Sequence, residues 1–470
     1  MESVPQFALW PTCNSSMDPI VTLSRKITAE RSDAETPFYI IDFDDLRYKI
    51  KLWNEVLPRV RPHYGKQICE VSVHYESSIG RAICFFTVLI SLQHLFEPDA
   101  VTFKVAVKCN ANVAILSIFQ QHGLGFDCAT RNEINLVLSM GISPNRIVYA
   151  HTVKSPSYLQ YAKNNGVARM TFDNSAELDK IKQFYSEAEL ILRLKVINTD
   201  RYKMSEKFGC LPEEAEKLLK KARALSLKVI GFSFHVGCQN QGSDVYRNAL
   251  RLCKQAEQEA IQLGYSPKLI DIGGGFEGFR GQEVNFRKIA ESIRKESDLL
   301  FPSDAGYQLI SEPGTFFVGS ALTLICRVVG KRNYKEINHI YVSDSVYMSF
   351  LPALYGDYYL RIQPMQSSTV YSEDSCGEGL VPTRIYGTTC DGVDIIVKQW
   401  NLPALEIGEW LLFYNQGAYT EAIETGFNML ERPTRFYRSS SPTDLEAARE
   451  ALTNHMKREV ESRSLGGKYI

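Results

Sequence analysis

The chain has 470 residues, of which 44% are hydrophobic and 23% are charged, and this composition excludes a wholly disordered or collagen-like protein. Its 53 basic and 54 acidic residues leave a net charge of −1, so we expect no basic field that would hold a nucleic-acid backbone. The 11 cysteines are scattered without CxxC spacing, which favours a reducing cytoplasm over a disulfide framework or a structural metal. We therefore predict a cytoplasmic protein that binds neither metal nor nucleic acid.

The longest apolar stretch, residues 82–96, is interrupted by Thr87, Ser91, Gln93 and His94 and is short for a membrane span. The first residues lack a basic segment followed by an apolar one, so they do not read as a secretory signal. We expect no association with a membrane.

Residues 1–35 are expected to form an N-terminal tail, and FYIIDFDD after them predicts a strand that leads into the helix-like LRYKIKLWNEVL. From Val101 to Pro313, short β-branched or aromatic runs alternate with amphipathic helical periods. The eight predicted strands are residues 101–107, 124–127, 146–150, 169–173, 190–194, 229–236, 268–272 and 307–311. Because apolar strands separated by single helices form a parallel sheet, eight such units predict an α/β fold, a (β/α)8 barrel over residues 44–315.

After Gly314 the pattern changes. Runs such as TFFVGSALTLICRVVGKR and EWLLFYNQG alternate with turn residues and have no helices between them. This pattern predicts a second, antiparallel β domain made of residues 36–43 and 316–438. Residues 439–470 are expected to form a tail with a helix whose start, Thr443 with Glu446, has the spacing of a capping box.

Chemistry in such a barrel sits at the carboxyl ends of the strands. The residues predicted there are Lys108, Asp127, Arg193, His235, the triplet Gly273, Gly274 and Gly275, and Glu312. A lysine at a barrel mouth can be desolvated, which lowers its pKa and frees the amine to attack an aldehyde; the alternative is a salt-bridged or surface lysine. Backbone N–H groups of a glycine triplet can converge on a phosphate, although such a triplet can also be only a tight turn.

Glu312 ends another strand and could hold a protonated ring nitrogen. His235 lies in the apolar run FSFHVG, where it is either a core histidine or a ring that stacks on an aromatic ligand. Taken together, these parts fit pyridoxal 5′-phosphate, which needs a lysine, a phosphate cradle, an acid for its pyridine nitrogen and groups that pack on its ring.

The segments that carry these residues resemble the ornithine decarboxylase family of pyridoxal-phosphate enzymes, which includes the antizyme inhibitors. The similar segments are AVKCN (106–110), GFDCAT (125–130), EINLVLSMG (133–141), FSFHVG (232–237), LIDIGGGF (269–276), SEPG (311–314), TTCDGVD (388–394) and GAYT (417–420). The resemblance covers roughly residues 36–438. It implies an alanine-racemase-like fold (fold type III) and decarboxylation of L-ornithine to putrescine in polyamine biosynthesis.

The resemblance also implies roles for single residues. Lys108 would bind the cofactor's aldehyde, Glu312 would pair with its pyridine nitrogen, and Cys390 would return a proton to the substrate carbon. Residues implied at the cofactor are Asp127, Arg193, His235, Cys238, Gly273, Gly274, Gly275, Pro313, Gly314, Thr315 and Tyr419. Residues implied at the substrate are Tyr355, Asp357, Asp391 and Phe427. Because Cys390 and Asp391 reach into the partner's barrel in this family, a homodimer with shared active sites is implied.

The chain departs from the family pattern first in the strand that carries the lysine. The family reads Pro-x-Tyr-Ala-Val-Lys-Cys-Asn without a break, whereas residues 65–105 here separate Pro62-His63-Tyr64 from Ala106. We expect this segment to be an intervening sequence translated in error. The alternative is a real insertion, after which VTFKVAV rebuilds the strand.

Three single positions also differ. Thr315 stands where the family has an arginine on the phosphate, and Cys238 stands where it has a serine. Gly356 separates Tyr355 from Asp357, which form an adjacent pair in the family. These changes leave two alternatives to an ornithine decarboxylase: a catalytically impaired regulator that binds antizyme, and a decarboxylase of another basic amino acid.

Overall fold

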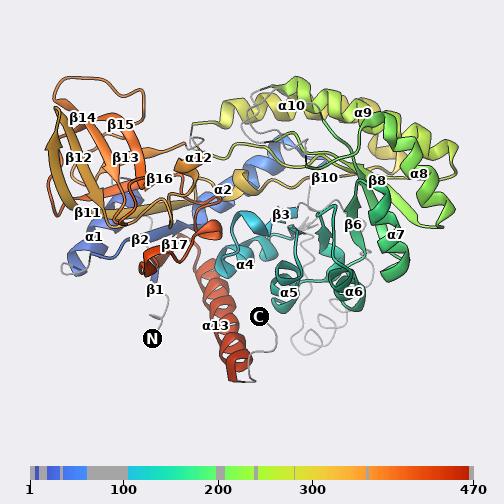
Figure 1. Ribbon diagram of the computed structural model, residues 1–470, viewed down its shortest axis with the longest axis horizontal. Coiled ribbons are helices and arrows are strands. Elements are labelled where there is room, and N and C mark those ends of the chain that lie inside the picture. The colour runs from blue at the N-terminus through green and yellow to red at the C-terminus, as the bar shows by residue number, and fades with distance from the viewer. Residues whose placement is uncertain are drawn as a thin grey trace, which may run out of the picture.

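The computed structural model describes residues 6–9, 18–31, 35–60, 104–196, 207–237, 242–279, 281–355 and 359–464. They form two domains that lie side by side, with a barrel-like α/β domain at the right of Figure 1 and a β domain at its left. The predicted insertion, residues 65–105, lies outside the described residues except for its last two positions, and its origin stays a prediction.

Eight parallel strands form the sheet of the first domain, in the spatial order β10-β9-β8-β7-β6-β5-β4-β3. Their bounds are β3 (Lys104–Ala106), β4 (Gly125–Cys128), β5 (Ile147–Tyr149), β6 (Arg169–Phe172), β7 (Glu189–Arg193), β8 (Lys228–Ser233), β9 (Leu269–Asp271) and β10 (Gln308–Ile310). All eight predicted strands are present, so the predicted series of strand–helix units is confirmed. In the part of the chain that the structure describes, the sheet ends at β3 and β10, and no pairing joins these two strands.

A helix follows each of these strands. The helices are α4 (Val113–Gln121), α5 (Arg131–Ser139), α6 (Pro156–Asn164), α7 (Ser175–Phe184), α8 (Ala215–Ala224), α9 (Ser243–Gln262), α10 (Glu283–Leu300) and the short α11 (Gly314–Val318). Side chains fix where several of them begin: Asn112 accepts from the backbone of Ala114 at α4, and Thr130 and Glu133 form a capping box at α5. Loops connect the carboxyl ends of the strands to these helices, and the predicted site residues lie at these ends.

The second domain is a nine-stranded sheet. It contains β1 (Gln6–Leu9), β2 (Phe38–Asp42), β11 (Leu322–Tyr334), β12 (Ile337–Val342), β13 (Arg361–Pro364), β14 (Leu380–Tyr386), β15 (Ile395–Pro403), β16 (Trp410–Tyr414) and β17 (Thr434–Ser439). The predicted antiparallel pairing holds for most neighbours. The pairs β1–β17, β17–β2 and β12–β14 are parallel, however, so the sheet is mixed.

The segment that was expected to be an N-terminal tail contributes to this domain. It contains β1 and α1 (Pro19–Glu30), and α1 buries Ile20, Leu23 and Ile27 against Phe38 and Ile40 of β2. The apolar spacing along α1 supplies one buried face, which the sheet covers.

Helix α2 (Phe43–Val56) starts directly after β2 and runs from one domain into the other (Figure 1). Its Trp53 is fully buried, with its ring centroid 5.0 Å from that of Phe276, 5.1 Å from that of Phe316 and 5.6 Å from that of Phe317. Aromatic packing at these distances joins α2 to the loop after β9 and to helix α11.

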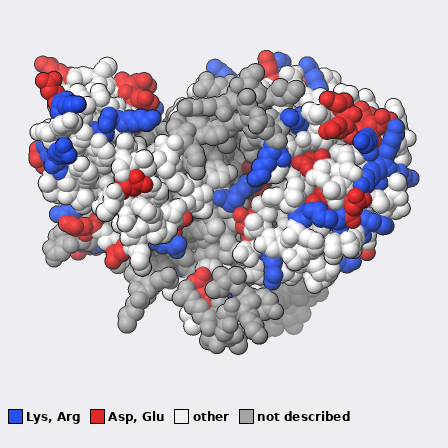
Figure 2. Space-filling view, viewed as in Figure 1, with Lys and Arg blue, Asp and Glu red and all other residues white. Residues whose placement is uncertain are grey.

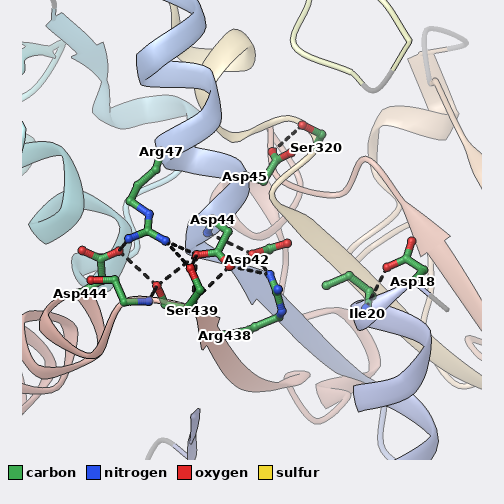
Figure 3. Close-up of polar contacts among 12 residues, drawn as sticks. Asp18, Ile20, Asp42, Asp44, Asp45, Arg47, Ser320, Arg438, Ser439 and Asp444 are labelled. Carbon is green, nitrogen blue, oxygen red and sulfur yellow. Dashed lines mark hydrogen bonds and ion pairs between the residues drawn. The ribbon is translucent and has the colours of Figure 1, made fainter. Parts of the chain in front are cut away.

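The C-terminal helix α13 (Pro442–Ser464) packs against α4 of the barrel domain. Ion pairs hold its start: Arg438 pairs with Asp42 and Asp44, and Arg47 pairs with Asp44 and Asp444 (Figure 3). The residues that were expected to form a C-terminal tail therefore include a helix that packs at the junction of the two domains.

On the face drawn in Figure 2, Lys and Arg side chains are intermixed with Asp and Glu side chains over both domains. Among the described helices, none combines the length and the apolar character that a membrane crossing requires.

Candidate active site

Lys108 and Asp127 form an ion pair where the first two barrel strands end. Lys108 lies in the short helical turn η1 (Val107–Cys109) after β3, and Asp127 lies in β4, one strand away. The Lys108 Nζ atom is 2.7 Å from Oδ2 of Asp127; the lysine side chain is 40% exposed and the carboxylate is fully buried. The pairing of Ala106 with Asp127 in the sheet sets this approach.

The charge state of Lys108 differs from the sequence-based prediction. Burial disfavours its ammonium form, but the negative charge of Asp127, with further contributions from Glu312 and Tyr419, outweighs burial and raises the pKa of Lys108 above its usual value. The prediction of a desolvated lysine with a lowered pKa was therefore wrong for the cofactor-free chain. The salt-bridged alternative describes this lysine better.

Glu312 follows β10. Whereas the surroundings of Lys108 favour its charged form, those of Glu312 favour the neutral form of its carboxyl group. Burial, together with the nearby carboxylates of Asp271 and Asp127, raises the pKa of Glu312 well above its usual value, against the opposing effect of Lys108 and Arg193. A carboxyl group in this setting favours its neutral form until a cation reaches it. A protonated ring nitrogen would be such a cation.

His235, just after β8, is a neutral ring. Burial, reinforced by the positive charges of Arg193 and Lys108, lowers the pKa of His235 to about 3. Its Nδ1 atom accepts a hydrogen bond of 3.0 Å from the backbone N–H of Gly237. Because a neutral imidazole carries one proton, that proton is on Nε2. The ring can thus stack on an aromatic ligand without adding a charge to the site.

The glycine triplet packs tightly against the loops around it. A Cβ atom on Gly273 would lie 2.2 Å from the Phe234 carbonyl oxygen, and one on Gly274 would lie 2.8 Å from the Glu312 carbonyl oxygen. On Gly275, whose φ is +96°, a Cβ atom would lie 2.3 Å from the Gly237 carbonyl oxygen. These positions require glycine, since any side chain would collide with backbone.

Arg193 and Thr315 lie at the end of β7 and after the end of β10, respectively. Arg193 ends β7, and its guanidinium lies 5.1 Å from the ring centre of Phe208. Thr315 is in the first turn of α11, after Pro313 and Gly314, which continue the Glu312 loop. Arg193 acts on both His235 and Glu312 through its charge, so it belongs to the same cluster.

The second domain supplies Tyr419 to the same end of the barrel. The backbone N–H of Tyr419 donates to the Cys109 carbonyl oxygen at 3.0 Å, and the side chain of Asn110 donates to the Gly417 carbonyl oxygen at 3.0 Å. Tyr419 adopts a left-handed backbone with a φ of 55°. This loop after β16 is therefore held directly against the turn that carries Lys108.

Cys390 and Asp391 lie elsewhere, in the loop between β14 and β15. The Tyr347 hydroxyl donates to Asp391 at 2.5 Å, and the Cys390 backbone N–H donates to the Asn428 side chain at 3.2 Å. The Phe427 ring lies 4.5 Å from that of Tyr347. The hydrogen bond from Tyr347 lowers the pKa of Asp391, so this exposed group is a carboxylate at neutral pH. The predicted residues thus form two groups, one at the barrel and one on the second domain.

Three predicted residues cannot be placed. Cys238 and Asp357 lie outside the described residues, and of Tyr355 only the backbone, in α12 (Pro352–Tyr355), is described. Their implied roles stay predictions.

The residues at the barrel mouth fit pyridoxal phosphate on structural grounds. The Oδ1 atom of Asp127 is buried without a hydrogen-bond partner among the described residues. The glycine loop lies against the neighbouring backbone at distances that no side chain would allow, and the His235 ring is neutral. Lys108 would bind the cofactor's aldehyde, Glu312 its ring nitrogen and the glycine loop its phosphate.

Sequence reasoning missed several residues that support these groups. Tyr246 donates to the Gly274 carbonyl oxygen, Ser311 to the Gly273 carbonyl oxygen, and Tyr347 to Asp391. Ser311 is the first residue of the SEPG motif, and its place in that motif could have indicated it. Tyr246 lies in the middle of α9, and no local pattern marks it.

Comparisons with known proteins agree with this site. The profile of the pyridoxal-dependent decarboxylase pyridoxal-binding domain matches residues 89–319. Ornithine decarboxylase of Mus musculus is 33% identical over 440 residues, which cover 89% of this chain and 84% of that protein. Antizyme inhibitor 2 of Xenopus laevis is 36% identical over 348 residues, which cover 71% of this chain and 74% of that protein.

A solved structure shows the same architecture. The arginine decarboxylase of Paramecium bursaria Chlorella virus superposes with a TM-score of 0.75 at 30% identity, covering 89% of this chain and 100% of that chain. Fold and site together define a pyridoxal-phosphate-dependent amino-acid decarboxylase of fold type III. Within that class, the chain belongs to the ornithine decarboxylase family.

Proposed function

We propose that this chain decarboxylates L-ornithine to putrescine, as a step of polyamine biosynthesis. The observation that carries the proposal is the convergence of Lys108, Asp127 and Glu312 at one end of the barrel, where the two carboxyl groups act electrostatically on the lysine. Ornithine decarboxylases among the relatives support the choice of substrate.

Pyridoxal phosphate, when bound, supplies an electron sink that weakens the bond to the departing carboxyl group. The chain's own residues do the rest. Lys108 must lose a proton before its amine can act as a nucleophile, and Asp127 Oδ2 lies within hydrogen-bond distance to accept it. Glu312 would hold the ring nitrogen, and His235 would cover the ring without adding charge.

A basic substrate fits the second group of residues. Asp391 is a carboxylate, and a carboxylate binds an ammonium or guanidinium group by a charge-assisted hydrogen bond. Cys390 is exposed beside it and suits the return of a proton to the substrate carbon. Both residues hydrogen-bond within the second domain. A homodimer in which this loop completes the partner's barrel is the arrangement that the family resemblance implies.

A regulator that binds antizyme is the second candidate, favoured by the similarity to antizyme inhibitor 2 and by Thr315 and Cys238. A decarboxylase of lysine or arginine is the third, favoured by the arginine decarboxylase structure. We propose a cytoplasmic location for all three.

The deciding experiment incubates purified, cofactor-saturated protein with ornithine, lysine and arginine and measures released carbon dioxide and the amine formed. We expect putrescine at a kcat/KM at least tenfold above those for cadaverine and agmatine formation. Light scattering on the same sample is expected to give the mass of a dimer. Antizyme binding without any amine product would replace the enzyme proposal with the regulator.

A further inference from the structure

We propose that Tyr246 and Ser311 are positioning residues that turn two backbone N–H groups of the glycine loop, residues 273–275, toward the phosphate of the cofactor. Neither touches the reacting atoms. The inference rests on the cofactor of the proposed function and extends it to two residues to which the sequence analysis assigned no role.

The two residues hold the carbonyl side of the loop. The Ser311 hydroxyl donates to the Gly273 carbonyl oxygen at 2.7 Å, and the Glu312 backbone N–H donates to the same oxygen at 2.8 Å. The Tyr246 hydroxyl donates to the Gly274 carbonyl oxygen at 3.0 Å. Both side-chain hydrogen bonds are buried, so water does not compete with them.

Because the peptide group is planar, these contacts also fix the direction in which the N–H group of the next residue points. In a trans peptide, the C=O of one residue and the N–H of the next point to opposite sides, and the described residues contain no cis peptide. The N–H of Gly274 therefore points away from Ser311, and the N–H of Gly275 points away from Tyr246. Neither N–H has an acceptor within the residues that the structure covers.

Gly273 differs from its two neighbours. Its N–H donates to the Oδ1 atom of Asp271 at 3.0 Å, which ties it to β9. The sequence predicted three equivalent glycines at the phosphate, whereas two of the three N–H groups remain for an anion. Successive N–H groups that point to one side form an anion-binding concavity.

Tyr246 is fixed in place by its surroundings. It is fully buried in α9, and its ring stacks on that of Phe276 at 5.0 Å with an angle of 22° between planes. A Cβ atom on Gly275 would lie 3.2 Å from the Tyr246 hydroxyl oxygen, so loop and hydroxyl are in close contact. Because the ring packing does not involve the hydroxyl, its hydrogen bond can be removed while the ring stays.

The sequence gives this arrangement a particular importance. Thr315 stands where the family has an arginine on the phosphate, so no guanidinium is supplied from that position. Backbone donors then carry a larger share of phosphate binding, and the orientation of their peptides matters more.

The test compares pyridoxal phosphate with pyridoxal, which lacks the phosphate, on the full-length cofactor-free protein. Dissociation constants are measured from absorbance, and inorganic phosphate is used as a competitor. We expect Tyr246→Phe to weaken pyridoxal phosphate binding about five- to tenfold, because one buried hydrogen bond is lost, and to change pyridoxal binding less than about twofold. Ser311→Ala is expected to act in the same direction.

Tyr265→Phe is the matched control. Its hydroxyl donates to the Leu227 carbonyl oxygen at 3.3 Å, outside the site, so both dissociation constants should stay at the wild-type value. Equal weakening of pyridoxal and pyridoxal phosphate in Tyr246→Phe would overturn the inference, and so would unchanged binding of both. Selective weakening in a protein that forms no putrescine would uphold the inference while removing the proposed activity.

Discussion

The amine of Lys108 lies 2.7 Å from the buried carboxylate of Asp127, on the neighbouring strand of the same sheet. This contact explains why the lysine is charged in the cofactor-free chain although burial disfavours its ammonium form. In the proposed enzyme the carboxylate would have two functions: it would keep the amine in the barrel mouth, and it would accept the proton that the amine must lose.

Removing the charge of Asp127 should make Lys108 a weaker base. In Asp127→Asn, burial still opposes the ammonium form while its strongest negative neighbour is gone, so the pKa of Lys108 should fall. The measurement is the pH dependence of the acylation rate of Lys108 in the cofactor-free protein, read by peptide mass spectrometry. Asp127→Glu keeps the charge and serves as the control. An unchanged pH profile in Asp127→Asn would show that Asp127 does not control this amine.

His235 should make the fold sensitive to mild acid. Its pKa is about 3 in the folded chain against an ordinary value of 6.5, so the unfolded chain takes up the proton first as the pH falls. Its contribution to stability is present above pH 6.5 and is lost as the pH falls from 6.5 toward 3. His235→Asn should reduce the slope of unfolding free energy against pH in this window by up to about 1.4 kcal/mol per pH unit.

Urea unfolding of both proteins between pH 4.5 and 7 would measure the two slopes. Above pH 7 the slopes should coincide, which serves as the internal control. Identical slopes throughout the acid range would mean that His235 titrates normally.

The ion pairs at the domain junction should contribute strongly to stability. Arg438 lies between Asp42 and Asp44, and the side chains of Arg438 and Asp42 are 10% and 9% exposed (Figure 3). Arg438→Met would leave these carboxylates without their buried partner, at an expected cost of about 3–5 kcal/mol in the free energy of unfolding. Urea unfolding followed by circular dichroism measures it.

Lys220→Met is the matched control, since Lys220 pairs with Glu216 on the surface of α8 with both side chains more than half exposed. Its removal should change stability by less than about 1 kcal/mol. A similar small loss for Arg438→Met would show that the junction tolerates the loss of this guanidinium.

The partners of the glycine-loop carbonyl groups and the parallel pairs of the mixed sheet could not be predicted from the sequence. Register and pairing of β1 with β17, 430 residues apart at Gln6 and Phe436, follow from contacts that no local pattern encodes. The hydroxyl of Tyr246 reaches Gly274 from a helix whose own periodicity marks the residue as core. Both are long-range relationships, which appear when the chain is folded.

The sequence by itself determined the eight strand–helix units and the placement of Lys108, Asp127 and Glu312 at strand ends, because hydrophobic periodicity and turn residues are local properties of the chain. Tertiary structure alone decided that Lys108 is charged, that Glu312 favours its neutral form and that two of three glycine N–H groups remain for an anion. Those properties depend on burial and on charges brought together from distant strands, and electrostatic energy follows distance in space, not separation along the sequence.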